Sequence, residues 1–306
     1  MSRLSVMLSG LRLENPIIPA SGTFGFGYEF SSWYDINILG SIALKSTTKT
    51  ERFGNLSPRI AECRNGMLNA IGLQNPGVDA VILQELPKLN KVFSKKIIAS
   101  VAGFSPEEYV YVAEKFDAVD QVGILEINLS CPNVKENGVT FASCTKTVFS
   151  VCQEIKKKTS KPVYIKLSPN VSDIVEMAIC AKNGGADGLT LCNTLLGTVI
   201  DTKTGRPVVS TKVAGFSGPA IKPVALKNVY QVSKEINIPI IASGGICDAD
   251  DVIEFLSAGA TATEVGSQNL VNPFVCKEII EELPRKMEEY GIKDLKDIIG
   301  RSHYVQ

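Results

Sequence analysis

The chain has 306 residues, of which 44% are hydrophobic and 21% charged, so it can bury a large core. Its 32 basic and 32 acidic residues leave no net charge, and the sequence shows no electrostatic footprint for nucleic acid or an anionic membrane. No stretch reaches the ~18 continuous apolar residues of a membrane span, and we expect a cytoplasmic protein.

The cysteines and the histidine argue against several kinds of site. None of the eight cysteines forms a CxxC pair, and His303 is the only histidine. Zinc and iron–sulfur sites need clustered ligands, so we expect no metal centre in this chain. A lone histidine near the C-terminus also argues against Ser-His-Asp and Cys-His chemistry.

Eight short runs rich in apolar and β-branched residues recur along the chain, and each ends in small or polar residues. Near-continuous apolar strands of this kind are typical of a parallel sheet covered by helices. The predicted strands are residues 16–22, 41–47, 96–103, 124–131, 162–168, 188–194, 239–245 and 260–267.

Helical segments separate several of these strands. The helix predicted at 106–118 has Ser105 as its N-cap and Pro106 in its first turn. The alternation predicts an α/β fold, and eight strands favour a closed (β/α)8 TIM barrel of one domain, residues 1–306, over the alternative of an open doubly wound sheet. The other predicted helices are residues 145–159, 172–183, 223–235, 248–258 and 273–290.

Three connections are longer than simple barrel loops, at residues 48 to about 79, 132–144 and 195–222. Each follows the C-terminal end of a predicted strand, which is the side where barrel active sites lie, and long ordered loops are often functional. The first ten residues or so are predicted to form a hairpin that plugs the opposite end of the barrel.

Two lysines lie within apolar strands of this predicted barrel. Because an unpaired buried charge is costly, Lys45 and Lys166 need an anion or a polar partner, and together they indicate an anionic ligand. The alternative is that each lysine pairs with a core carboxylate such as that of Glu126.

Two glycine-rich turns end the seventh and eighth strands. Backbone N–H groups at Gly244-Gly245 and Gly266-Ser267 can approach a phosphate closely, and the loops after these strands commonly bind phosphate in barrels. The alternative for either turn is a plain tight turn.

Four asparagines, Asn69, Asn128, Asn133 and Asn193, also lie at or near strand ends. Their amides can donate and accept, which suits a planar cyclic imide or amide as ligand. The alternative for each asparagine is a role in a turn or a helix cap.

Cys131 is the candidate general base. It ends the fourth predicted strand and begins a long loop, in the string Ser130-Cys131-Pro132-Asn133. A thiol has a pKa of about 8.5, so a cysteine can act as a base once its site tunes it. The alternative is a buried cysteine with a structural role.

These stretches together resemble the dihydroorotate dehydrogenase family, from Leu4 to about Tyr290. The resemblance implies a (β/α)8 barrel that carries FMN at its C-terminal mouth and oxidises dihydroorotate to orotate in pyrimidine biosynthesis. The matching strings begin at residues 15 (NPIIPASGTFGFG), 44 (LKSTTKTERFG), 69 (NAIGLQNPG), 126 (EINLSCPNVK), 164 (YIKLSPNVSD), 187 (DGLTLCNTL), 217 (SGPAIKPVAL) and 244 (GGI).

The resemblance also implies roles for individual residues, with Cys131 as the active-site base. The residues implied to bind substrate are Lys45, Asn69, Ala70, Ile71, Gly72, Leu73, Asn128, Asn133, Asn193 and Thr194. The residues implied to bind FMN are Ser21, Lys45, Ser46, Ser100, Asn128, Lys166, Cys192, Gly218, Gly244, Gly245, Gly266 and Ser267. Ser100 and Cys192 depart from the family pattern, which usually has asparagine and an aliphatic residue there.

Within the family, a cysteine at position 131 resembles the soluble forms. Among these, the strings that begin at residues 69 and 217 resemble the NAD-linked form. That form implies a heterotetramer in which a homodimer of barrels joins a partner subunit bearing FAD and a [2Fe–2S] cluster. The alternatives are a fumarate-linked homodimer, an FMN barrel for another pyrimidine, and a non-catalytic scaffold subunit.

Overall fold

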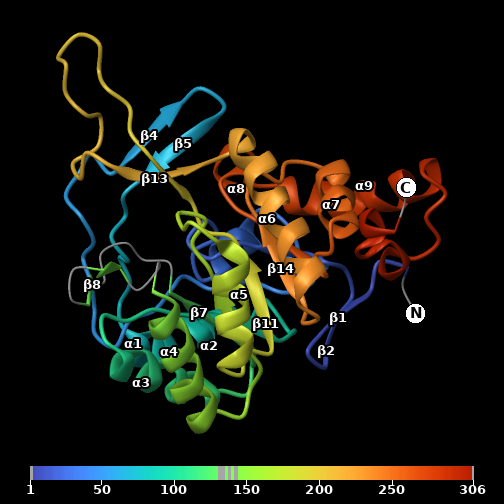
Figure 1. The fold of residues 1–306 in the computed structure, drawn as a ribbon, viewed down its shortest axis with the longest axis horizontal. Helices are drawn as coiled ribbons and strands as arrows, with labels where there is room; N and C mark the ends of the chain where they lie inside the picture. Colours follow the sequence, from blue (N-terminus) through green and yellow to red (C-terminus); the bar gives the residue numbers. More distant parts are fainter. Residues whose placement is uncertain (1–2, 130–134, 137–138, 141–143, 305–306) are drawn as a thin grey trace.

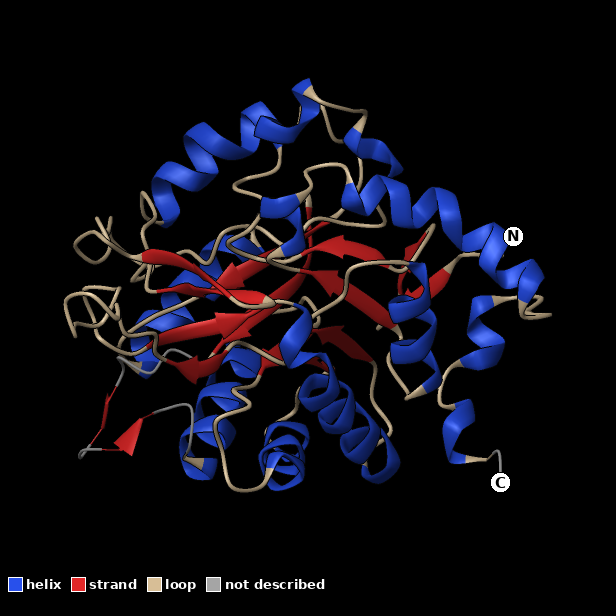
Figure 2. Cartoon of the chain, turned by 90° about the horizontal axis from the view of Figure 1, so that it is seen from above, coloured by secondary structure: helices blue, strands red, loops and turns tan. Residues whose placement is uncertain are grey.

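The fold is known from a computed structural model, which describes residues 3–129, 135–136, 139–140 and 144–304. Strands occupy the centre and helices surround them on the outside (Figures 1 and 2). Among the described residues, no helix combines the length and apolar character needed to cross a membrane.

Seven parallel strands form the central sheet, in the order β3-β15-β14-β11-β10-β7-β6. Nearly every residue in them is buried, because helices cover the outside while side chains fill the inside. Their bounds are β3 Ile17–Pro19, β6 Ile97–Val101, β7 Val122–Asn128, β10 Val163–Lys166, β11 Gly188–Leu191, β14 Ile240–Ser243 and β15 Ala262–Val265.

Residues 41–47 close the gap between the first and last strands of this sheet. The N–H of Ala43 donates to Pro19 O at 3.2 Å, and the N–H of Leu44 donates to Ile98 O at 2.9 Å. The prediction of a continuous strand here was wrong, because the segment makes only the isolated parallel bridges Ala43↔Ile98 and Thr47↔Val101. It still bonds to both neighbours, so the strands form a closed ring and the predicted barrel is confirmed.

The predicted helices are confirmed within a few residues at each end. Side chains cap three of them: Ser105 Oγ accepts from Glu108 N, Asp173 from Val175 N, and Asp248 from Asp251 N. The main helices are α3 Pro106–Asp117, α4 Thr145–Lys158, α5 Ile174–Asn183, α6 Lys222–Glu235, α7 Ala249–Ser257 and α9 Val275–Glu289. Shorter ones are α1 Val78–Ala80, the π turn Val81–Glu85, α2 Leu86–Leu89, α8 Gln268–Val271 and 3₁₀ turns at Tyr28–Ser32, Ile36–Ile38, Pro219–Ile221, Leu295–Ile298 and Arg301–His303.

The N-terminal hairpin plugs the bottom of the barrel, as predicted. It consists of β1 (Val6–Leu8) and β2 (Leu11–Leu13), paired antiparallel. Its buried side chains pack against the lowest inward-facing residues of the barrel strands, such as Tyr164 and Ile241. The Ser9 hydroxyl at its turn lies 3.0 Å from the Tyr164 hydroxyl, which fixes the plug to the wall.

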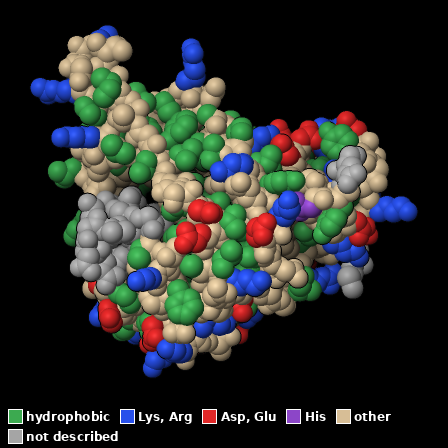
Figure 3. All heavy atoms as spheres, in the orientation of Figure 1, with side chains coloured by type: hydrophobic (Ala, Val, Ile, Leu, Met, Phe, Trp, Pro, Cys, Tyr) green, Lys and Arg blue, Asp and Glu red, His purple; other side chains and the backbone are tan. Residues whose placement is uncertain are grey.

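The long connections build a second sheet that the strand pattern did not predict. Its four antiparallel strands run in the order β12-β13-β5-β4. The strands are β4 Ile60–Cys63, β5 Gly66–Asn69, β12 Leu195–Gly197 and β13 Ala214–Ser217, and a separate short pair is β8 Lys135–Glu136 with β9 Val139–Thr140. Leu196 of this sheet and Val213 beside it are about half exposed. Hydrophobic side chains gather over this part of the molecule in Figure 3.

We expect Leu8→Ala to destabilise the protein, because Leu8 is fully buried between the hairpin and the barrel floor. The loss should be about 2–5 kcal/mol of unfolding free energy, measured by urea denaturation. Met7→Ala is the matched control, since Met7 lies on the same strand but is 53% exposed, and it should change stability by about 0.5 kcal/mol or less. Equal losses in the two variants would contradict the plug.

Candidate active site at the mouth of the barrel

Two layers of side chains fill the barrel, and their chemistry changes sharply from one to the next. The lower layer is apolar and consists of Ile18, Ala43, Ile98, Ile124, Tyr164, Ile241 and Ala262. Inward-facing residues recur every second position along a strand, so the next layer toward the C-terminal ends consists of Ala20, Lys45, Ser100, Glu126, Lys166, Thr190, Ser243 and Glu264. This polar layer is the floor of the mouth.

Lys166 is paired within this floor. Its Nζ lies 2.6 Å from Glu264 Oε2 and 3.5 Å from Glu126 Oε1, and all three side chains are buried. The alternative that Lys166 pairs with a core carboxylate is therefore confirmed. Glu264 was not among the predicted site residues, although a charged residue within the apolar run 260–267 is a sequence signal for such a role, and the structure buries it in β15.

The pKa values of these three groups depend on one another. Burial, together with the nearby Glu126 carboxylate, raises the pKa of Glu264 to about 8. Burial alone would lower the pKa of Lys166, but attraction to Glu126 and Glu264 outweighs it and raises that pKa. These shifts favour a charged lysine and a protonated form of Glu264.

A chain of hydrogen bonds crosses the mouth between strand ends. The Ser46 hydroxyl lies 3.2 Å from that of Ser21 and 2.8 Å from that of Ser100. Asn128 Nδ2 donates to Ser46 Oγ at 3.1 Å, and Asn193 Nδ2 donates to Asn128 Oδ1 at 3.5 Å. The structure thus brings together five of the predicted site residues, which lie far apart in the sequence.

The antiparallel sheet carries Asn69 to the same mouth. Asn69 ends β5, and its Nδ2 donates to Gly215 O of β13 at 3.5 Å. A Cβ on Gly215 would lie 2.3 Å from Thr194 Oγ1 and 3.3 Å from Asn69 Nδ2, so these two side chains flank the glycine. Close packing at a glycine therefore holds Asn69 beside Thr194.

Residues 70–73 adopt an unusual backbone conformation. Gly72 and Leu73 both have positive φ, and Asn55 brackets the turn because its N–H donates to Ile71 O and its Nδ2 to Ala70 O. Asn75 Nδ2 donates to Leu73 O at 2.7 Å. Backbone this closely held presents its groups in a defined geometry.

Lys45 lies on the side of the mouth formed by the first strand. Its Nζ is 3.6 Å from the position that a Cβ on Gly22 would occupy, and the backbone N–H of Lys45 donates to Gly25 O. The ammonium group therefore packs against backbone that has no side chain in the way.

The two glycine-rich turns fit an anion. Gly244 and Gly245 both have positive φ, as does Gly218, whose added Cβ would lie 2.5 Å from Gly66 Cα. Among the described residues, no acceptor takes the N–H of Gly244, Gly245, Gly266 or Ser267. These four donors lie at the ends of the neighbouring strands β14 and β15, where they could hold a phosphate.

Three predicted residues need separate comment. The Cys192 side chain is buried against α6, where Asn228 Nδ2 lies 3.8 Å from its sulfur, and burial raises its pKa to about 11. The peptide bond between Leu191 and Cys192 is cis. Cys131 and Asn133 lie outside the described residues, so their predicted roles stay predictions.

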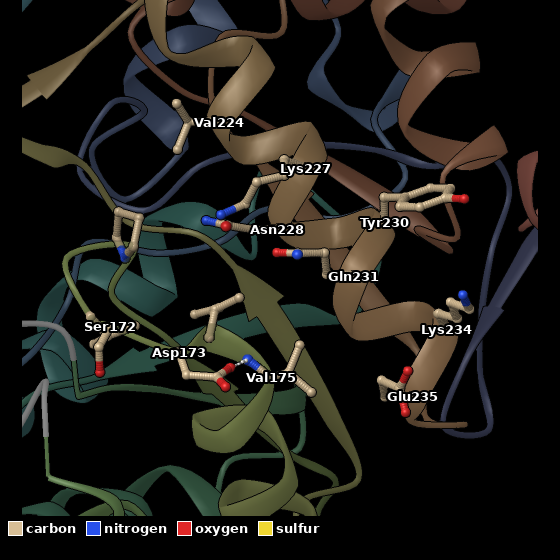
Figure 4. A pocket seen from close by; sticks show the side chains of 13 residues that line it. Ser172, Asp173, Val175, Val224, Lys227, Asn228, Tyr230, Gln231, Lys234 and Glu235 are labelled. Carbon is tan, nitrogen blue, oxygen red and sulfur yellow. Dashed lines mark hydrogen bonds between the residues drawn. The ribbon is translucent and has the colours of Figure 1, made fainter.

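A surface hollow of about 640 Å³ lies elsewhere, between α5 and α6 (Figure 4). Asp173 at its edge is a helix cap, because its carboxylate accepts the N–H groups of Val175 and Glu176. Lys227 and Gln231 of α6 also line it. This hollow lies between helices outside the strand ring and contains none of the predicted site residues, so the mouth remains the candidate site.

Comparisons with known proteins agree on one family. The family model described as dihydroorotate dehydrogenase matches residues 3–287. A relative from Malacoplasma penetrans is 52% identical over 302 residues, covering 99% of this chain and 98% of its own. One from Halalkalibacterium halodurans is 54% identical over 302 residues, covering 99% of each. Both are named dihydroorotate dehydrogenase B (NAD(+)), catalytic subunit.

The fold has a solved counterpart. The crystal structure of a DHODH from Eimeria tenella in complex with ferulenol superposes with a TM-score of 0.81. The match covers 100% of this chain and 90% of that one at 22% sequence identity, so it supports the barrel fold.

We expect Gly245→Ala to destabilise the protein, because φ is +78° and the new methyl would lie 2.8 Å from Lys222 N and Cβ. Gly291→Ala is the matched control, since φ is +66° and nothing lies within 4 Å. The control isolates the cost of positive φ, about 1–2 kcal/mol. Gly245→Ala should cost about 1–3 kcal/mol more in chemical denaturation, and an equal cost would mean that the turn is not closely packed.

Proposed function

This chain belongs to the dihydroorotate dehydrogenase family, and we propose that it oxidises dihydroorotate to orotate in pyrimidine biosynthesis as an NAD-linked catalytic subunit. The observation that carries the proposal is identity above 50% over nearly the whole chain with relatives of that name. The polar floor and the hydrogen-bonded strand ends lie at the C-terminal mouth of the barrel, where barrel enzymes have their active sites.

FMN fits the residues at the mouth. The N–H groups of Gly244, Gly245, Gly266 and Ser267, which have no acceptor in the described part of the chain, would hold its phosphate, and Gly218 would let the backbone approach. The remaining contacts would come from Ser21, Lys45, Ser46, Ser100, Asn128, Lys166 and Cys192. When bound, FMN supplies the acceptor for the hydride that leaves C6 of dihydroorotate.

The chain's own residues would orient the substrate and move its proton. Lys45 and the backbone of residues 71–73 would hold the substrate carboxylate, and the ring would contact Asn69, Ala70, Asn128, Asn133, Asn193 and Thr194. Cys131 would remove the proton from C5 as general base. Holding the ring against a fixed base and a fixed acceptor turns an encounter into an intramolecular step.

The electrons then leave through a partner. The relatives' name, catalytic subunit, supports a second kind of subunit. We propose that this partner bears FAD and a [2Fe–2S] cluster and passes electrons to NAD⁺, within a cytoplasmic heterotetramer built on a homodimer of barrels, each a single domain over residues 1–306. Half-exposed apolar side chains on the antiparallel sheet, such as Leu196, offer a surface for such contacts.

The direct test uses the purified chain. Dihydroorotate should bleach a bound yellow flavin without oxygen, and orotate should shift the flavin spectrum. Turnover with NAD⁺ should require co-expression with the partner subunit. Rapid turnover of the isolated chain with fumarate would favour the fumarate-linked alternative, and a colourless protein that takes up no FMN would overturn the proposal.

Cys131→Ala should keep bound FMN and lower kcat by about 10²–10⁴-fold, because the variant lacks the general base. Steady-state turnover of dihydroorotate measures this loss. Cys131→Ser should be slow at neutral pH, since a serine hydroxyl is a far weaker acid than a thiol, and should recover as pH rises.

Cys180→Ala is the matched control, because Cys180 is a free cysteine on α5, well outside the mouth. It should keep wild-type turnover. If Cys131→Ala also turns over at the wild-type rate, Cys131 is not the base.

A further inference from the structure

Two carboxyl oxygens beneath the mouth have no hydrogen-bond partner among the described residues. They are Glu126 Oε1 and Glu264 Oε1, and both are fully buried. The other oxygen of each group is occupied, since Thr190 Oγ1 donates to Glu126 Oε2 at 2.9 Å and Lys166 Nζ donates to Glu264 Oε2 at 2.6 Å. Each carboxyl group therefore has one oxygen with a hydrogen bond and one without, and the unbonded oxygen of Glu126 has only the Lys166 ammonium group near it, at 3.5 Å.

A single proton would satisfy both unbonded oxygens. An ionised carboxylate only accepts hydrogen bonds, whereas a protonated one can also donate. The carboxyl groups of Glu126 and Glu264 both lie beside the Lys166 ammonium group, at 3.5 and 2.6 Å, and each affects the pKa of the other. A proton held between them turns two unpaired acceptors into a donor and an acceptor.

The charge balance leads to the same conclusion. Two carboxylates and one ammonium group would leave one net negative charge in a barrel core where all three side chains are buried. Such a charge is poorly solvated there, and one bound proton makes the group neutral.

We propose that Glu126 and Glu264 share one proton and act as positioning residues that hold Lys166 charged beneath the mouth. The shared proton is a property of this chain alone. Its effect on the reaction rests on the proposed function, in which Lys166 contacts the flavin.

Few other titratable groups surround Glu126 and Glu264. Glu264 lies beside Ile18 of β3 and Ser243 of β14 in the sheet register. Hydroxyls of Ser100 and Thr190 face Glu126. The cationic side chains of the layer are Lys166 and, across it, Lys45; the Tyr164 hydroxyl lies one layer below, and the Cys192 thiol follows β11.

The sign of the pH dependence follows from the raised pKa of Glu264, about 8. Below that pH the pair keeps its proton and the three side chains are neutral together. Above it the proton leaves and one negative charge remains beside the flavin site. Because linkage is reciprocal, adding electrons to a flavin there must strengthen the hold on that proton.

The first experiment tests the shared proton without any flavin. Infrared spectroscopy of the flavin-free protein, with ¹³C-labelled glutamate, should show one buried protonated carboxyl at pH 7 that disappears as pH rises through about 8. Glu264→Gln should abolish this band, and Glu126→Gln should give the same result if Glu264→Gln fails to fold. Glu288→Gln is the control, because its side chain is 71% exposed, and should keep the band.

The absence of a protonated carboxyl in the wild-type protein at pH 7 would overturn the proposal. Retention of the band in both glutamine variants would overturn it as well, because the proton would then belong to another group.

The second experiment tests the effect on the cofactor in the FMN-bound protein. The midpoint potential, followed by spectroelectrochemistry across pH 6–10, should show up to one additional proton taken up per two electrons in a window that begins near pH 8 and extends above it. Glu264→Gln should lose this additional uptake, whereas Glu288→Gln should keep it. A role that is only structural would leave the pH profile unchanged.

The two experiments separate the possible failures. A normal infrared band in a protein that takes up no FMN would defeat the proposed function and leave the shared proton standing. A normal flavin whose potential has the same pH profile in wild type and Glu264→Gln would defeat the positioning role.

Discussion

The closure of the strand ring at residues 41–47 is the constraint on which the rest of the structure depends. This segment is too irregular to be a full strand, yet its backbone bonds to β3 on one side and β6 on the other. Closure brings the C-terminal ends of strands from the whole chain to one mouth. Without it, the hydroxyls of Ser21, Ser46 and Ser100 would not meet.

Closure also creates an interior with little water, in which buried charges must be neutralised by one another. The hairpin and the apolar layer seal the lower end, so Lys166, whose side chain is only 7% exposed, must be neutralised largely within the barrel. Attraction to Glu126 and Glu264 outweighs the cost of burial and keeps the ammonium group charged. A lysine held in this way is a fixed cation beneath the site, and a lysine on the surface would be mobile and screened.

The antiparallel sheet supports the long loops at the mouth. Asn69 and Thr194 belong to connections that start more than a hundred residues apart, and the pairing of β5 with β13 places them on either side of Gly215. Backbone pairing gives these loops the order that a packed site requires. In a dihydroorotate dehydrogenase, the same sheet would then fix one wall of the substrate pocket.

Local chemistry in the sequence determined most of the elements: the apolar strand runs, the Ser105 cap, the N-terminal hairpin and the glycine turns at 244–245 and 266–267. These features depend on residues close in sequence, so their patterns are readable without a fold. The family strings extended the prediction to the site residues. Only the tertiary structure decided that residues 41–47 bridge rather than form a full strand, that β5 pairs with β13, and that Glu264 meets Lys166. Those pairings join residues distant in the chain, and the geometry of the closed ring, which no local pattern encodes, selects them.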